Sequence, residues 1–410
     1  MYNCDKARLQ NKIDTFSKFG DTGTGGITRL SLSEPALQAR AEFKKRCEDL
    51  GMEFKTDDMG NMYTVHKGEE DLPAIVMGSH LDSVVNGGNF DGVLGVLTAL
   101  EVAETIVSEK IKTRGPIAVM VWTNEEGSRF DPAMMSSGVV TGKFDKATML
   151  NSKDKEGTAF GEALKASGYA GAEKNRLNAD DYAGYFELHI EQGPVLEAEA
   201  KDIGVVEGVV GMINYEIDVK GVSDHAGTTP QKTRKDALYA ASKIIIDLWE
   251  KLGKINPELV FTMGRINASP NIHTVIPKEV RFTLDARHKD PKIIERAAEV
   301  IKALPAEVAK CQVSYRQLWG RKTIEFNKDY VAAVQRAADG FGYSSRKIYS
   351  GAGHDAQYVA DVMPATMIFV PSVNGHSHCV EEFTPTEAAL KGANVLLNAV
   401  LEIDKNYRGR

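Results

Sequence analysis

Cysteine is scarce in this sequence. Only four occur among 410 residues, Cys4, Cys47, Cys311 and Cys379, and they show no paired spacing. A disulfide framework is therefore not indicated. We expect reduced thiols and a cytoplasmic location.

Long apolar runs and a surplus of positive charge are also missing. No uninterrupted apolar stretch approaches the roughly 20 residues that a membrane-spanning helix needs. The formal net charge is −7, so no broad basic field favours nucleic acid or an anionic membrane as a partner. The first residues, MYNCDKARLQNKID, are polar and lack the apolar region of a signal peptide. We expect a protein that binds neither nucleic acid nor membrane.

The sequence has the composition of a globular protein, with 42% hydrophobic and 26% charged residues. Its 410 residues are enough for about two domains. Candidate strands alternate with candidate helices, which predicts an α/β fold whose sheet is mainly parallel at its centre. The expected helices are 34–51, 92–110, 329–341 and 385–405. The expected strands are 73–79, PIAVMVW, 185–193 and ATMIFVP, with a hairpin that turns near Gly60.

A different pattern begins near Val209. One strand, helix 235–252, the strands LVFTMGRINAS and EVRFTLDARH, a helix interrupted by proline, and the strand QVSYRQLW follow in the order βαββαβ. This order is that of a ferredoxin-like unit. We expect residues 209–323 to form a domain inserted into a larger domain made of 1–208 and 324–410, and to serve dimerisation or to act as a lid.

Polar side chains gather where the expected strands of the larger domain end. GSHLDSVVNGGNFDG carries His80, Asp82 and Asp91, and the other clusters are TNEEGSRF, ELHIEQG and GHSH. Ligands of α/β sheets sit at the carboxyl ends of strands, so these clusters could converge. Each one alone has an ordinary explanation, such as a structural histidine, a solvated acidic pair or a helix N-cap. Four together indicate a site for two divalent ions, with one carboxylate bridging them.

These motifs, with HAGTTP and SGAGHDA, resemble the amidohydrolase and carbamoylase branch of the M20 superfamily of dinuclear-metal hydrolases. They occur in the family's order and separations, and EEGSRF and HIEQGPVLE favour this branch over the peptidases. The resemblance implies two ions per subunit, zinc, manganese, cobalt or nickel. It implies these ligands: His80 and His189 for one ion, Glu126 and His378 for the other, and Asp91 bridging both. His376 then fills the variable position of the motif.

The resemblance also implies the catalytic residues. Glu125 matches the general base, and Asp82 matches a carboxylate that orients His80. His225 matches a residue that reaches the scissile carbonyl from the partner subunit and stabilises the oxyanion, which implies a homodimer. From the residues alone, His225 could instead be a turn residue after Asp224.

Substrate-binding residues are implied as well. Gln192, Gly353 and Arg287 match positions that contact a small substrate bearing a carboxylate, with Arg287 as a bidentate clamp. From the residues alone, an ion-paired surface arginine explains Arg287 better. Thr274 stands where relatives commonly have asparagine, and it is shorter and donates one hydrogen bond fewer. The role of His354 is not fixed by its motif.

The expected activity is hydrolysis of a linear amide or ureide C–N bond. An N-carbamoyl-L-amino acid is the first-choice substrate, giving the amino acid, carbon dioxide and ammonia. Allantoate amidohydrolase, β-ureidopropionase and dipeptidase activities are the alternatives within the enzyme class. A metal-binding relative without turnover is the alternative outside it, and the presence of Glu125 argues against that.

Overall fold

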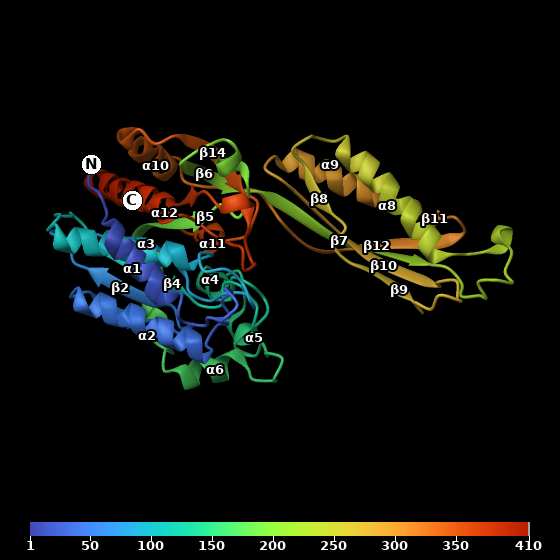
Figure 1. The fold of residues 1–410 in the computed structure, drawn as a ribbon, viewed down its shortest axis with the longest axis horizontal. Coiled ribbons are helices and arrows are strands. Elements are labelled where there is room, and N and C mark those ends of the chain that lie inside the picture. The colour runs from blue at the N-terminus through green and yellow to red at the C-terminus, as the bar shows by residue number, and fades with distance from the viewer. Residues whose placement is uncertain (409–410) are drawn as a thin grey trace. The chain divides into compact units, whose positions relative to one another are not determined.

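The protein is described by a computed structural model that covers residues 1–408. Its internal contacts divide it into two compact units, one made of residues 1–208 and those from 325 onward, the other of residues 209–324 (Figure 1). Within residues 1–408, no helix combines the length and the apolar character needed to cross a membrane.

The first unit is built on a nine-stranded mixed sheet. Its strands are β1 (Glu53–Thr56), β2 (Met62–His66), β3 (Ala74–His80), β4 (Ile117–Trp122), β5 (Tyr182–Ile190), β6 (Ile203–Val209), β13 (Ile324–Glu325), β14 (Ser345–Ser350) and β15 (Ala365–Val370). They run in the order β1-β2-β4-β3-β5-β15-β6-β13, and β14 also pairs with β6. The central strands β4, β3, β5 and β15 are parallel, and antiparallel strands flank them. The predicted fold class is confirmed.

Helices pack against this sheet and beside its edges. They are α1 (Lys6–Phe16), α2 (Glu34–Asp49), α3 (Val93–Ser108), α4 (Met135–Val140), α5 (Lys146–Leu150), α6 (Phe160–Ser167), α7 (Val195–Ala198), α10 (Lys328–Phe341), α11 (Asp355–Val359) and α12 (Thr386–Asn406). Helix α3 lies on β3, β4 and β5 and contacts α12, so it is almost wholly apolar and buried. The four parallel strands are buried along their whole length, which explains their continuous apolar sequences.

The second unit is an antiparallel sheet covered by two helices. It contains β7 (Gly211–Lys220), α8 (Ala237–Gly253), β8 (Val260–Thr262), β9 (Ile266–Ser269), β10 (Glu279–His288), α9 (Pro291–Lys302), β11 (Glu307–Val308) and β12 (Cys311–Arg321). The strand order is β11-β12-β7-β10-β8, and β9 pairs with β10. The expected single strand LVFTMGRINAS is in fact two, β8 and β9, separated by residues 263–265.

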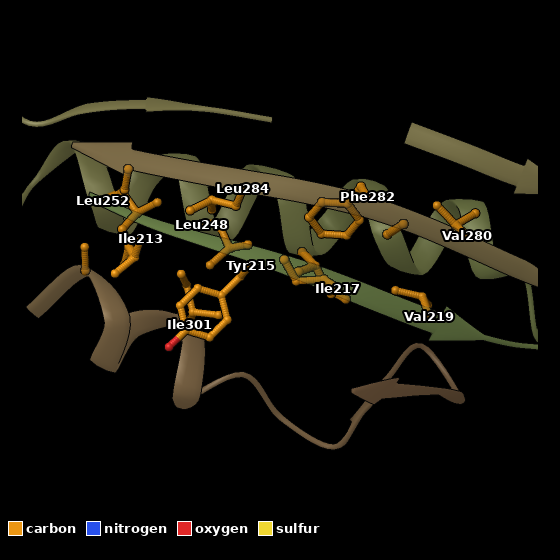
Figure 2. Packing of buried hydrophobic residues seen from close by; sticks show 14 of the residues in the cluster. Ile213, Tyr215, Ile217, Val219, Leu248, Leu252, Val280, Phe282, Leu284 and Ile301 are labelled. Atoms are coloured by element: carbon orange, nitrogen blue, oxygen red, sulfur yellow. The ribbon is translucent and has the colours of Figure 1, made fainter. Parts of the chain in front are cut away.

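The core of this second unit lies between the sheet and its helices. Figure 2 shows Leu284 of β10 close to Leu248 of α8, and Ile217, Phe282 and Leu252 belong to the same buried cluster. These five side chains are fully buried. The unit therefore has a hydrophobic core of its own.

Candidate metal centre and active site

The ends of the parallel strands hold the polar clusters. His80 is the last residue of β3 and pairs with Trp122, the last residue of β4, which leads into Glu125 and Glu126. His189 lies one residue before the end of β5 and pairs with Phe369 near the end of β15. This register brings the segments that follow these strands to one edge of the sheet.

Asp91 is the point on which the cluster converges. Its Oδ1 atom lies 3.7 Å from His80 Nε2 and 3.2 Å from His189 Nε2. Its Oδ2 atom lies 3.5 Å from His378 Nε2, which in turn is 3.3 Å from Glu126 Oε2. The five predicted ligands therefore meet in two groups of three that share Asp91.

The donor set fits two divalent ions. The groups are His80, Asp91 and His189, and Asp91, Glu126 and His378, and the ligand atoms within each group lie within 4.8 Å of one another. Glu126 Oε1 is buried and has no hydrogen-bond partner among residues 1–408, which would be costly unless an ion occupies that side of the carboxylate. Imidazole and carboxylate donors of this kind suit zinc and related metals.

Main-chain carbonyls hold the first group's imidazoles in orientation. His80 Nδ1 lies 3.0 Å from the Asp82 carbonyl oxygen, and His189 Nδ1 lies 2.9 Å from the Ile190 carbonyl oxygen. A carbonyl can only accept, so each Nδ1 carries a proton, and a ring that is neutral has its Nε2 lone pair facing Asp91. This is the tautomer that a metal ligand requires.

Asp82 contributes to the site in two ways. Besides its carbonyl, its carboxylate lies 3.9 Å from His80 Nδ1. The same carboxylate accepts hydrogen bonds from the main-chain N–H groups of Glu125 and Glu126, at 3.3 and 3.2 Å. Asp82 thus connects the end of β3 to the turn that carries both glutamates.

The pKa values of several buried groups in the cluster are strongly shifted. Burial alone would raise the pKa of Asp91, but His189, His80 and His378 outweigh it and hold that pKa far below its usual range. Burial alone would lower the pKa of His189, but Asp91 and Glu187 raise it to about 9. In the metal-free protein, Asp91 and His189 therefore form a buried ion pair at neutral pH.

Glu125 has the opposite electrostatic environment. Burial, with Asp355 and Glu126 nearby, raises its pKa well above the usual range. It is 8% exposed and its Oε2 atom lies 3.6 Å from His80 Nε2. Glu125 is a member of neither three-residue ligand group. The pKa of Glu126 is raised as well, so it is the position of Glu125 beside the ligand groups that suits proton transfer better than coordination.

Glycines keep bulk away from the cluster. A Cβ atom on Gly92 would lie 2.1 Å from the His80 ring, and Gly92 has a φ of +67°, so both space and backbone conformation require glycine there. Gly87 and Gly88 do not have left-handed backbones. A Cβ atom on Gly88 would lie 2.2 Å from Glu382, so close approach of a side chain explains that glycine.

The predicted substrate residues of the first unit lie beside this cluster. Gln192 Nε2 donates to Asp91 Oδ2 at 2.6 Å, and Ser377 Oγ donates to the same atom at 2.7 Å. Gly353 is half-buried and precedes His354, whose Nε2 lies 2.8 Å from Ser350 Oγ. His354 also stacks edge-on against His189, with 4.6 Å between ring centroids.

Three predicted site residues lie in the second unit. His225 Nδ1 accepts hydrogen bonds from the N–H groups of Gly227 and Thr228 at 3.0 and 3.2 Å. The carbonyl of Thr274 accepts from Ala226 N–H at 2.9 Å, so Thr274 lies beside the His225 segment. Arg287 Nε donates to Asp285 Oδ1 at 2.7 Å. This is the ion pair that the residues alone favoured.

Comparison with known proteins agrees with this geometry. Residues 76–402 match the family described as Peptidase family M20/M25/M40. The chain is 38% identical over 399 residues to an N-carbamoyl-L-amino-acid amidohydrolase of Rhizobium meliloti, covering 96% of this chain and 95% of that protein. It is 34% identical over 392 residues to an allantoate amidohydrolase of Escherichia coli K12, covering 95% of each.

This chain belongs to the M20 family. A hydantoinase/carbamoylase-family amidase from Burkholderia multivorans has the same fold with a TM-score of 0.91 and 41% identity, over 98% of both chains. The protein is therefore an M20 amidohydrolase of the hydantoinase/carbamoylase branch, as the motifs predicted.

Glu382 is one of the residues of this amidohydrolase's site that sequence reasoning missed, and Ser377 is another. Glu382 is buried, and its carboxylate accepts hydrogen bonds from the N–H groups of Phe90, Asp91 and His378. Burial and the nearby Asp91 raise its pKa to about 7. The sequence offered only a pair of acids, Glu381 and Glu382, three and four residues after the predicted ligand His378, and such a pair is usually solvated.

Proposed function

We propose that this M20 amidohydrolase hydrolyses N-carbamoyl-L-amino acids to the amino acid, carbon dioxide and ammonia. The observation that carries the proposal is Glu125, a buried carboxylate with a raised pKa, placed beside two ligand groups that share Asp91. The similarity to the Rhizobium meliloti amidohydrolase supports the choice of substrate class.

We further propose that each subunit holds two divalent ions, zinc, manganese, cobalt or nickel. His80 and His189 would bind one, Glu126 and His378 the other, and Asp91 both. When bound, such ions polarise a carbonyl and lower the pKa of a nearby water molecule. The chain's own contribution is to fix five donors on four segments.

Glu125 is proposed to move the proton. It would take one from the attacking water and deliver it to the departing nitrogen. Its raised pKa supports both steps, because it makes the carboxylate a stronger base than an ordinary glutamate toward the proton of the attacking water. Asp82 keeps Glu125 in place through the hydrogen bond to its main-chain N–H.

His225 is proposed to stabilise the oxyanion. Its Nδ1 atom accepts two main-chain N–H groups, so in the neutral ring the proton resides on Nε2. A ring fixed in this tautomer can donate from Nε2 to developing negative charge. We propose that His225 of the partner subunit performs this role, which requires a homodimer.

One surface of the second unit supports the homodimer. Tyr239, Ile246 and Trp249 of α8 are 58, 60 and 58% exposed. Trp249 contacts Phe261 of the edge strand β8 edge-on, at 5.0 Å between ring centroids. An apolar helix face beside an open strand edge is a surface that a second copy of the chain would bury.

The substrate's carboxylate is proposed to bind Arg287, with Gln192 and Gly353 contacting the remainder. Thr274 is the position that points to a substrate other than an ordinary N-carbamoyl amino acid, and allantoate is the second candidate. Thr274 replaces the asparagine common in relatives, and a missing donor to a charged group costs about 1.5–3 kcal/mol when nothing substitutes for it. The 34% identity to the Escherichia coli allantoate amidohydrolase supports this alternative.

A substrate panel tests the proposal. Ammonia release is measured with N-carbamoyl-L-amino acids, allantoate, β-ureidopropionate and dipeptides, each with zinc, manganese, cobalt or nickel added. The first proposal is supported if the carbamoyl amino acids have the highest kcat/KM of the panel. The second is supported if allantoate has the highest kcat/KM. Thr274→Asn is the matched variant: it should raise kcat/KM for carbamoyl amino acids only if the natural substrate is different. Dipeptides ranking first would overturn both proposals.

A further inference from the structure

Glu382 is a buried carboxylate to which neither the metal chemistry nor the proton transfer assigns a task. It is 4% exposed. Its Oε1 atom accepts from Phe90 N–H at 2.8 Å and from Asp91 N–H at 2.9 Å. Its Oε2 atom accepts from His378 N–H at 3.1 Å. One carboxylate therefore joins two segments about 290 residues apart in the sequence, and each segment carries a candidate ligand.

We infer that Glu382 is a positioning residue that sets Asp91 and His378 at the separation needed to hold one ion between them. The inference rests on the proposed two-ion centre. Its chemical basis is the geometry of coordination, since metal ligands must be held within a fraction of an ångström and groups outside the coordination shell usually hold them.

His378 has little else to fix it. Its side chain is 49% exposed, so packing restrains it weakly. It lies in the segment after β15, outside any helix or strand, with a φ of +59°. A non-glycine residue in the left-handed region is held there by its surroundings. The hydrogen bond from its N–H to Glu382 fixes this backbone relative to the Asp91 segment, beside the hydrogen bond from the neighbouring Ser377 Oγ to Asp91 Oδ2.

The two imidazoles of the other ligand group do not depend on Glu382. His80 and His189 lie within strands β3 and β5, and main-chain carbonyls orient both rings. Removing Glu382 should therefore weaken the ion held by Asp91, Glu126 and His378 more than the ion held by His80, Asp91 and His189. This asymmetry separates a positioning role from a general contribution to folding.

A substitution at Gly88 is a second way to displace the Glu382 carboxylate. A Cβ atom there would lie 2.2 Å from the Glu382 carboxyl carbon and 2.3 Å from its Cβ. Gly88 is not among the candidate ligands, and its backbone is not left-handed. Gly88→Ala should displace Glu382 without changing a ligand or straining φ.

The experiment measures metal binding without substrate. Four proteins are stripped of metal and titrated with zinc against a competing chelator: wild type, Glu382→Gln, Gly88→Ala and Glu381→Gln. Glu381→Gln is the control, because it changes an exposed neighbour of Glu382. Hydrogen exchange is followed at residues 88–92 and 376–380, and thermal unfolding of the metal-free proteins is recorded.

Glu382→Gln and Gly88→Ala should each retain one site of wild-type affinity and weaken the other by about 10–100-fold, the usual loss when such a supporting group is removed. Exchange should quicken in both segments, and Glu381→Gln should behave as wild type. The inference would be overturned if Glu382→Gln bound zinc at both sites with unchanged affinity, or if both sites were weakened equally. If that variant does not fold, the same criteria apply to Gly88→Ala. Because substrate is absent, an enzyme that hydrolyses no ureide yet shows the asymmetry would contradict the proposed function and leave the inference standing.

Discussion

Asp91 lies within 4 Å of three imidazole nitrogens that come from three separate segments. Asp91→Asn keeps the shape but replaces one carboxylate oxygen by a nitrogen that cannot coordinate. We expect this variant to lose both ions and all activity, because each oxygen serves a different group. Metal content after dialysis and ammonia release check this. A variant that keeps two ions, or a chelator-stripped wild type with full activity, would contradict it.

Glu125 and Glu126 are neighbours with different expected roles, so two matched variants separate them. Glu125→Gln should retain metal and lose turnover by at least about 100-fold, the usual scale for a general acid–base group. Glu126→Gln should lose an ion, because Glu126 Oε2 lies 3.3 Å from His378 in a ligand group. The same metal and kcat measurements are made on both. The reverse pattern would exchange the two assignments.

The ion pair of Asp91 and His189 predicts a pH dependence of metal binding. With a pKa of about 9 in the metal-free protein, His189 is protonated at neutral pH. A metal must displace this proton, so apparent affinity should rise with pH and level off near pH 9. Calorimetry in buffers of different ionisation enthalpy should show proton release at pH 7 and less at pH 9.5. Binding without proton release at pH 7 would contradict the assignment.

The individual ligands could be proposed from sequence because strand ends, spacing and family motifs point to the same positions. The contacts that support them could not. Asp82 was expected to orient His80 by its carboxylate, yet its carbonyl makes the hydrogen bond. Glu382 joins segments that only the folded sheet brings together. Main-chain acceptors and tertiary partners leave no pattern in a sequence.

At the level of elements, buried strands and long amphipathic helices were predictable. The runs that became β3, β4 and β15 are apolar throughout, and α2 and α10 begin and end within one or two residues of expectation. Among the elements not anticipated are α1, β6 and β14. The half-buried β14 and the mixed sequence of α1 take their conformation from partners elsewhere in the chain, such as β6 for β14.

Helix α8 offers a test of the second unit's core. Leu248 is fully buried against the sheet (Figure 2). Leu248→Ala should lower the free energy of unfolding by about 2–5 kcal/mol through lost burial and a residual cavity. Glu250→Ala, on the exposed side of the same helix, should change it little. Denaturant unfolding of both variants measures the difference. Equal effects would show that the helix is not held by this core.

For the whole molecule, the change from alternating strands and helices to the order βαββαβ is visible in sequence, because each element has its own hydrophobic period. The structure divides at residues 208 and 324. The assignment of one unit to catalysis and the other to dimerisation remains a prediction, since a pairing surface depends on a second chain. The substrate likewise depends on a few pocket contacts, such as that of Thr274, that fold and family leave open.

Mixing two inactive chains tests whether the units cooperate between subunits. We expect His225→Ala and Glu125→Gln homodimers each to be nearly inactive. If His225 acts on the partner subunit's site, a hybrid dimer has one centre in which intact Glu125 of one chain meets intact His225 of the other. Random mixing gives half hybrids, each with one working centre, so about a quarter of wild-type activity should return after co-refolding or prolonged exchange. Each variant mixed with itself is the control. Mass measurement should show that the mixed sample contains hybrid dimers. If activity does not recover in such a sample, or if a monomer is fully active, His225 acts in its own subunit's site or takes no part in the chemistry.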